Sequence, residues 1–129
     1  NTRMLDIFLF ASLLVKHAIA DLFLQSFRTP TDKSRWSNPG LHLHSLDHGI
    51  LTTLILIAWP QVPFVYALGL GLLDYALHVV IDNLKTRTVN YFQVDRNGKL
   101  FWRIQAVDQA LHYLTYLLLV VLAKHFGLL

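Results

Sequence analysis

Histidine and aspartate residues recur four positions apart in four otherwise apolar stretches of the chain. His17 and Asp21 form the first such pair, and His78 and Asp82 form the third. The full set of candidate metal ligands is His17, Asp21, His44, His48, His78, Asp82, Asp108 and His112. Because residues four apart share one face of a helix, each helix can direct its pair inward. A buried charge needs a partner, so we expect the four pairs to face one another.

Imidazole and carboxylate groups gathered in a low-dielectric bundle suit a divalent transition metal, with zinc, iron or manganese as the natural candidates. The set is larger than one tetrahedral ion needs, so the site could hold one or two ions. The chain has no Cys, which excludes thiolate ligands. All eight acidic residues are Asp, which excludes the Glu-rich di-iron sites of ferritin-like bundles. Asp21 and Asp108 are the candidate catalytic bases.

Other polar residues accompany this set. We expect four of them to orient the ligands or to contact a substrate near the mouth of the site: Gln25, Lys33, Lys85 and Gln109. Asp74 lies four residues before His78 on the same helix face, one turn farther from the cytoplasm. A carboxyl group buried there would need a proton or a hydrogen bond. Lys16 lies mid-span and would face either the bundle or a partner protein. Two alternatives to a metal site stay open: a metal-free polar network, and ligation of a haem or a pigment, for which His78 with His112 would supply the two imidazoles of a haem.

The stretches that carry these residues are predicted to span a membrane. Of the 129 residues, 54% are hydrophobic and only 15% are charged, whereas about a quarter are charged in a soluble domain. A span needs about 20 apolar residues, and four windows come close: residues 4–27, 43–59, 64–84 and 104–122. The predicted fold is therefore all-α, a polytopic membrane protein whose four transmembrane helices form an antiparallel bundle. The bundle is a single membrane domain over residues 1–129.

Basic residues are concentrated in two connections, residues 28–41 and 85–103, which hold eight of the eleven Lys and Arg. The positive-inside rule places both connections in the cytoplasm and both termini in the periplasm. The third connection, "PQVP", is a tight turn. An Asn-Gly pair between aromatic runs in the 85–103 connection favours a small hairpin on the membrane surface.

The candidate ligands all fall in the cytoplasmic half of their predicted helices, and their depths match. The deeper layer is expected to hold His17, His48, His78 and His112. The layer nearer the cytoplasm is expected to hold Asp21, His44, Asp82 and Asp108. The order of the motifs also predicts a degenerate repeat of two hairpins, in which "HAIAD" and "HSLDH" answer "HVVID" and "DQALH".

These motifs resemble those of a family of small bacterial four-helix inner-membrane proteins catalogued as a domain of unknown function. The shared patterns are His-x3-Asp-x3-Gln, His-x3-Asp-x2-Lys and Asp-Gln-x2-His, and the resemblance covers nearly the whole chain. It maps onto all the candidate ligands together with Gln25, Lys33, Lys85 and Gln109. The chain departs from the family at Leu22, where an aromatic residue usually follows Asp21. The resemblance implies the fold, a bacterial inner membrane and the polar residue set, but no activity.

Two classes of function fit these expectations. The first is a membrane-embedded, metal-dependent hydrolase in which the ion activates water and Lys33, Lys85 and Arg87 border a site for an anionic lipid or another phosphoester. With iron, the same ligands would permit oxidation of a lipid chain. The second is a non-enzymatic subunit of a larger membrane complex, or a homo-oligomer, with a structural polar or metal core. The apolar outer halves of the helices disfavour ion transport, and the expected partner is the lipid bilayer rather than nucleic acid.

Overall fold

The computed structural model describes residues 2–24 and 33–129, with side chains from residue 4 onward. Within these residues the fold is all-α, with no strand. The elements in chain order are the α-helix α1 (Thr2–Ala18), the π-helical segment η1 (Ile19–Leu24), and the α-helices α2 (Pro39–Ile57), α3 (Phe64–Tyr91) and α4 (Lys99–His125). Gln25, which was expected near the mouth of the site, lies outside the described residues.

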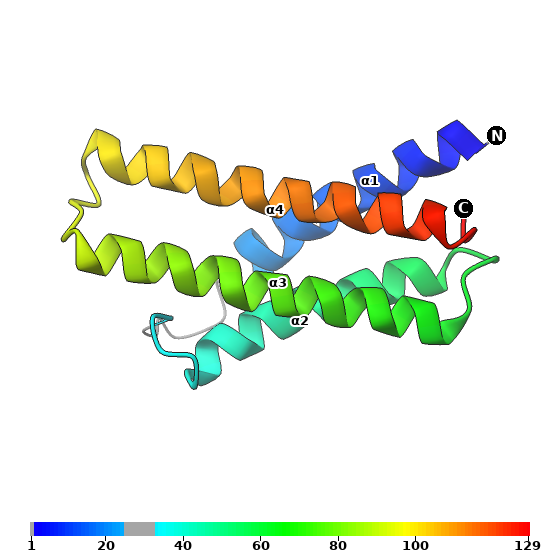
Figure 1. Ribbon diagram of the computed structural model, residues 1–129, viewed down its shortest axis with the longest axis horizontal. Helices are drawn as coiled ribbons and strands as arrows, with labels where there is room; N and C mark the ends of the chain where they lie inside the picture. Colours follow the sequence, from blue (N-terminus) through cyan, green and yellow to red (C-terminus); the bar gives the residue numbers. More distant parts are fainter. Residues whose placement is uncertain (1, 25–32) are drawn as a thin grey trace.

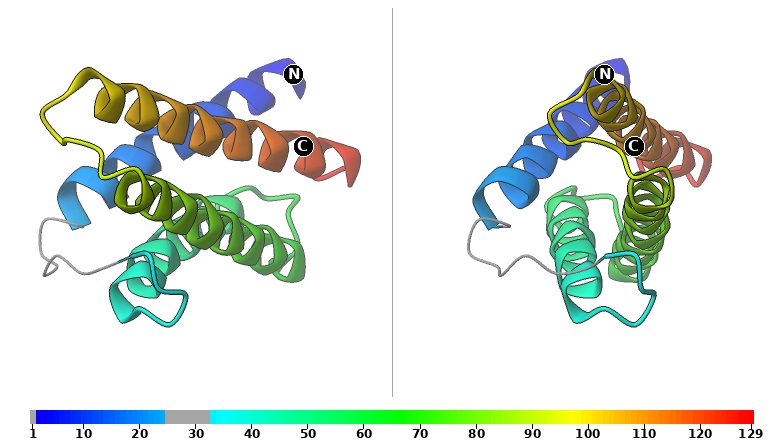
Figure 2. Two further views of the ribbon diagram at one scale, coloured as in Figure 1. Left: turned by 60° about the vertical axis from the view of Figure 1, so that its left-hand side comes forward. Right: turned by 90° about the vertical axis from the view of Figure 1, so that its left-hand side faces the viewer.

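The helices surround a common interior. Each of α2 and α3 packs on its neighbours in sequence, and α1 also packs on α4, which closes a ring of helices. The end-on view in Figure 2 shows the four helices around this interior. Both termini and the turn between α2 and α3 lie at one end of the molecule (Figure 1). The ring therefore brings side chains from four separate stretches of sequence toward a shared axis.

Three helical segments are long and apolar enough to cross a membrane: Met4–Leu24, Phe64–Tyr91 and Lys99–His125. They overlap the first, third and fourth predicted spans, and the helices of the third and fourth extend beyond the predicted bounds. α2 is not among the described segments that meet this criterion, because its first half, "PGLHLHSLDHG", is largely polar or small. Leu22, Val65 and Val107 are at least 60% exposed. Large apolar side chains on the outside are the arrangement expected of a surface that contacts lipid.

The connection between α3 and α4 is shorter than the sequence predicted. The hairpin expected there is wrong, because α3 continues to Tyr91 and α4 begins at Lys99, leaving residues 92–98 as the loop. The aromatic runs that suggested two strands end one helix and begin the next. The Asn-Gly pair instead belongs to a turn in which Asp95 accepts a hydrogen bond from the Asn97 backbone N–H, 3.0 Å away. The basic residues of this region are therefore carried mainly by helices.

Two glycines allow α2 and α3 to approach closely. A Cβ atom added to Gly71 would lie 1.9 Å from Thr53 Oγ1 and 2.8 Å from the Gly49 carbonyl oxygen. A Cβ atom added to Gly49 would lie 2.8 Å from the Gly71 carbonyl oxygen. Gly69, by contrast, has no neighbouring atom within 4 Å of such a position. Gly71 is thus a residue on which the helix contact depends.

The interior is divided into an apolar and a polar half. The apolar half lies toward the termini and holds Leu9, Leu13, Ala67, Leu119 and Ala123, among others. The buried polar residues occupy the other half, at the C-terminal part of α1, the N-terminal part of α2, and the adjoining parts of α3 and α4. The prediction that the polar residues share one half of the bundle agrees with this arrangement, and the apolar half fixes the helices that position them.

Candidate metal centre

Asp21 is the point at which three imidazoles meet. Its Oδ1 lies 2.8 Å from His48 Nε2 and 3.1 Å from His44 Nε2, and its Oδ2 lies 3.0 Å from His17 Nε2. Asp21 belongs to η1, where α1 widens into a π-helix. Such turns are rare and are frequent at functional sites. The wider turn changes the helical register just where the carboxylate must meet α2.

A second group of ligands lies between α3 and α4. His112 Nε2 is 3.3 Å from Asp82 Oδ1 and 3.5 Å from Asp108 Oδ1. This group is joined to the first by His44, whose Nε2 lies 3.7 Å from Asp82 Oδ2. All three of these acidic and imidazole side chains of α3 and α4 are buried. The two groups therefore form one continuous cluster rather than two separate sites.

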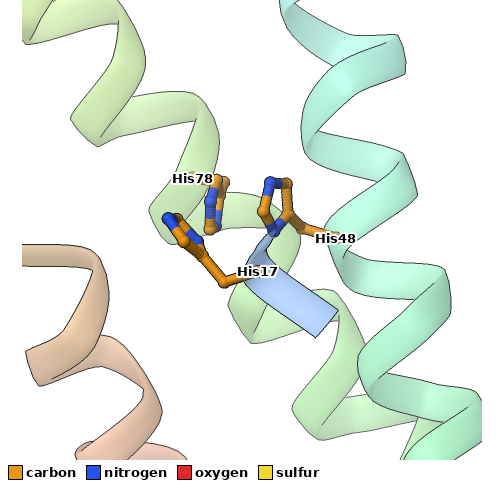
Figure 3. Close-up of side chains that lie close together, drawn as sticks. All are labelled: His17, His48 and His78. Carbon is orange, nitrogen blue, oxygen red and sulfur yellow. The ribbon is translucent and has the colours of Figure 1, made fainter. Parts of the chain in front are cut away.

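Three of the imidazole rings are stacked. The ring centroids of His48 and His78 are 3.7 Å apart, and those of His78 and His112 are 4.0 Å apart. Figure 3 shows His17, His48 and His78 reaching toward one another from α1, α2 and α3. Haem ligation by His78 with His112 is inconsistent with this geometry, because rings stacked at 4.0 Å leave no room for a macrocycle between them.

The donor atoms suit a metal ion. Three sets of side chains each offer ligand atoms within 4.8 Å of one another: His17 with His48 and His78, Asp21 with His44 and His48, and Asp82 with Asp108 and His112. Within the described part of the chain, four buried atoms of the cluster have no hydrogen-bond partner: His44 Nδ1, His78 Nε2, Asp108 Oδ1 and His112 Nδ1. Buried polar atoms are normally satisfied, so this shortage of donors fits a bound cation.

Asp74 supports the cluster from the apolar side. Its Oδ1 lies 3.1 Å from His78 Nδ1, and its Oδ2 accepts hydrogen bonds from Thr52 Oγ1 (2.5 Å) and Lys16 Nζ (2.7 Å). If His78 donates through Nδ1, its unpartnered Nε2 carries the lone pair. A carboxylate that fixes the tautomer in this way is the usual partner of a metal-binding histidine. Asp74, ambiguous in the sequence, is thus a positioning residue for His78.

Lys16 faces the bundle, which was one of its two expected positions. Its ammonium lies 3.1 Å from His48 Nδ1 and can only donate, so this nitrogen must accept. His48 then carries its proton on Nε2 and donates it to Asp21. A metal bound at His48 Nε2 requires the opposite tautomer. An ion that took the lone pair of His48 Nε2 would therefore require the contact of His48 Nδ1 with Lys16 to be released.

The described outer polar residues lie beside the cluster. Gln109 Oε1 is 2.9 Å from His17 Nε2. Lys33 Nζ is 3.5 Å from Asp82 Oδ2, and Lys85 Nζ is 3.5 Å from Asp108 Oδ2. Each of these side chains contacts a candidate ligand directly. The lysines offset the negative charge that the aspartates bring to the cluster.

The structure adds residues that the sequence did not single out. Tyr116 is fully buried, and its hydroxyl lies 2.5 Å from His17 Nδ1. Asn83 donates to the carbonyl oxygens of Lys33 and Ser34 at 2.9 and 2.8 Å. The available signal for Tyr116 was its position four residues after His112, on the same face of α4. Asn83 had no such signal, because its partners are backbone atoms of a distant turn.

Comparison with known proteins identifies the family to which the chain is similar. No curated protein and no solved structure matches the chain. One family model matches residues 9–128, a region that includes every candidate ligand, and its description reads "Protein of unknown function (DUF3307)". The resemblance to a family of unknown function is thereby confirmed. Since the match covers nearly the full length, the chain belongs to the DUF3307 family.

Proposed function

We propose that this protein is an integral membrane protein whose His/Asp cluster binds one or two divalent transition metal ions and hydrolyses a lipid or another phosphoester. The observation that carries the proposal is the convergence of eight imidazole and carboxylate side chains from all four helices. The buried atoms among them that make no hydrogen bond, such as His78 Nε2 and His112 Nδ1, support a cation rather than a closed polar network. Zinc, iron and manganese suit these ligands.

Each of the two sets of ligands would hold one ion. His17 and His78, with Asp21, His44 and His48 beside them, would hold one ion, and Asp82, Asp108 and His112 would hold the second. A bound divalent ion supplies Lewis-acid polarisation of a phosphoryl oxygen and makes water a nucleophile near neutral pH.

An aspartate of the cluster would take the proton from the attacking water. Asp21, with a side chain 24% exposed, and Asp108, beside Lys85, are the candidate bases. The base takes a proton from water as the water oxygen attacks phosphorus. The ester P–O bond breaks, and the leaving oxygen takes a proton to become an alcohol. Lys33 and Lys85 would offset the charge of the phosphoester.

We further propose the membrane arrangement expected from the sequence. α2, although less apolar, would complete a four-span antiparallel bundle, because it closes the ring between α1 and α3. Lys33, Arg87 and Arg103 would lie on the cytoplasmic side of a bacterial inner membrane, and both termini would lie in the periplasm. The occurrence of both termini at one end (Figure 1) agrees with an even number of spans.

Metal content tests the proposal. The protein is purified in mild detergent and analysed by elemental mass spectrometry, together with His78→Ala, Asp82→Ala and His125→Ala. His125 is an exposed histidine at the far end of α4 and serves as the matched control. We expect bound metal in the wild type and in His125→Ala, and less metal in each of the other two variants, because each lacks a ligand of one of the two sets. Release of inorganic phosphate from lipid phosphates on adding zinc, manganese or iron then tests the hydrolase activity.

The second candidate function is a small subunit of a larger membrane complex, or a homo-oligomer, with a structural core. The observation in its favour is the Lys16–Asp74 ion pair, which a catalytic site does not require. Wild-type protein that holds no metal and folds normally would favour this alternative and exclude the hydrolase.

A further inference from the structure

A groove between α3 and α4 leads along the outside of the helices to the candidate metal centre. Its volume is about 400 Å³, and its walls are mainly aliphatic, with Leu84 from α3 and Leu100, Ile104 and Val107 from α4. Asp108, a candidate ligand, lies in its lining. A volume of this order is within the range of small-molecule sites, about 300–1,000 Å³. The groove thus connects a lipid-facing surface with one end of the His/Asp cluster.

Two basic residues and one acidic residue line the same groove. Lys85 and Arg103 lie in its lining, one from each helix. Lys85 Nζ also contacts Asp108 at 3.5 Å, while Arg103 is exposed. An apolar trough with two cations near a carboxylate ligand matches an amphiphile that has one chain and one anionic head group.

A second groove provides a comparison within the same molecule. It lies between α2 and α3, has a volume of about 250 Å³, and is lined by residues such as Ile50, Leu54 and Leu68, with no charged residue in its lining. Ordinary bilayer lipid would fill both grooves through the hydrophobic effect. Of these two, the α3–α4 groove lined by Lys85 and Arg103 is the one that adds cations able to select a head group.

We infer that the α3–α4 groove binds the single alkyl or isoprenyl chain of a lipid monophosphate, with its phosphate held by Lys85 and Arg103 beside Asp108. This assignment rests on the proposed function, whose substrate class it narrows. The phosphate would then lie next to the Asp82, Asp108 and His112 set, while the chain stays in contact with lipid.

The experiment uses chelator-treated protein in phosphatidylcholine nanodiscs, so that binding is separated from metal and from hydrolysis. The probe is a dodecyl phosphate with a photoreactive group on its chain, and labelled peptides are mapped by mass spectrometry. We expect label on the α3–α4 groove, displaced by unmodified dodecyl phosphate but not by dodecanol or inorganic phosphate. Val107→Trp, which fills this groove, should abolish the labelling, whereas Leu54→Trp in the α2–α3 groove should leave it unchanged.

The charged residues are tested by Arg103→Gln, which leaves the Lys85–Asp108 pair intact, and by Lys85→Gln. Loss of one charge-assisted contact should weaken probe binding roughly tenfold in each variant. The inference would be overturned by equal labelling of both grooves or by displacement of the probe by dodecanol. Unchanged probe binding in Arg103→Gln or in Lys85→Gln would also overturn it. Specific labelling of a protein that never binds metal would leave the groove assignment standing and exclude the hydrolase.

Discussion

Lys16 and Asp74, 58 positions apart in the sequence, form an ion pair of 2.7 Å inside the bundle, where both side chains are almost fully buried. The pair joins α1 to α3 at the boundary between the apolar and the polar half of the interior. Removing one member of such a pair leaves an uncompensated charge, which typically costs about 3–5 kcal/mol.

Lys16→Met should therefore destabilise the protein by an amount in that range, because Asp74 loses its cation. In the double variant Lys16→Met/Asp74→Asn, much of the loss should be recovered, since no buried charge remains while Thr52 can still bond to residue 74. Thermal unfolding in detergent measures the stability of each variant relative to the wild type. Asp74→Asn alone completes the comparison: if the loss of stability in the double variant equals the sum of the losses in Lys16→Met and Asp74→Asn, the two residues are not coupled.

A different prediction concerns Asp21, where His17, His44 and His48 meet. Asp21→Asn removes the negative charge shared by these imidazoles and should weaken metal binding at least roughly tenfold. Asp6→Asn is the matched control, because Asp6 belongs to α1, which leads into η1, and pairs with Lys124 at the other end of the molecule. Titration of the chelator-treated protein with Zn²⁺ measures the affinities. Equal affinities for both variants would remove Asp21 from the centre.

Much of the site could be predicted because the spacing of polar residues is a local property of the sequence. The four-residue interval of His78 and Asp82 fixes their common face on any helix, and mid-helix charges must then converge with others. The described members of the predicted ligand set do lie together. Asp74 and Lys16 stayed ambiguous because their pairing depends on how α1 and α3 cross, which no local spacing reveals.

The features that could not be predicted depend on how each segment packs against the other helices. The hairpin expected in residues 85–103 failed because the Asn-Gly pair is equally compatible with a helix-to-helix turn, and the helices on each side simply continue. The π-helical segment that carries Asp21 has no known sequence signal, since it adapts α1 to its partners. α2 was predicted as a span from its apolar second half, whereas its polar first half is explained by the cluster it faces.

The contact between α2 and α3 leads to a prediction about glycine. Gly71→Ala should destabilise the protein by about 1–3 kcal/mol, because the new methyl group would overlap Thr53 Oγ1 and the Gly49 carbonyl oxygen. Gly69→Ala, two residues away on the same helix, meets no atom within 4 Å and should be neutral or slightly stabilising. Thermal unfolding of the two variants side by side checks the expectation. Equal destabilisation would mean that the helices do not approach at Gly71.

Asn83 should control the turn that precedes α2. Its amide nitrogen donates to the Lys33 and Ser34 carbonyl oxygens, and this places Lys33 near Asp82. Asn83→Ala should increase hydrogen exchange of the amides in residues 33–37 and cost about 1–3 kcal/mol for the two bonds together. Asn90→Ala, at an exposed position on α3, is the control and should change neither. Unchanged exchange in Asn83→Ala would show that other contacts hold the turn.

Metal binding should also stabilise the fold. A ligand that binds only the folded protein contributes about 2.7 kcal/mol at a concentration 100 times its Kd, because the ligands come from four helices and are dispersed on unfolding. The wild type should therefore unfold at a higher temperature with Zn²⁺ than with a chelator. His112→Ala should reduce this difference, since His112 contacts both Asp82 and Asp108, whereas His125→Ala on the same helix should retain it in full. An equal shift in both variants would mean that Zn²⁺ acts elsewhere on the protein, because His112 lies in the middle of α4 and contacts the cluster, whereas His125 is the exposed last residue of the helix.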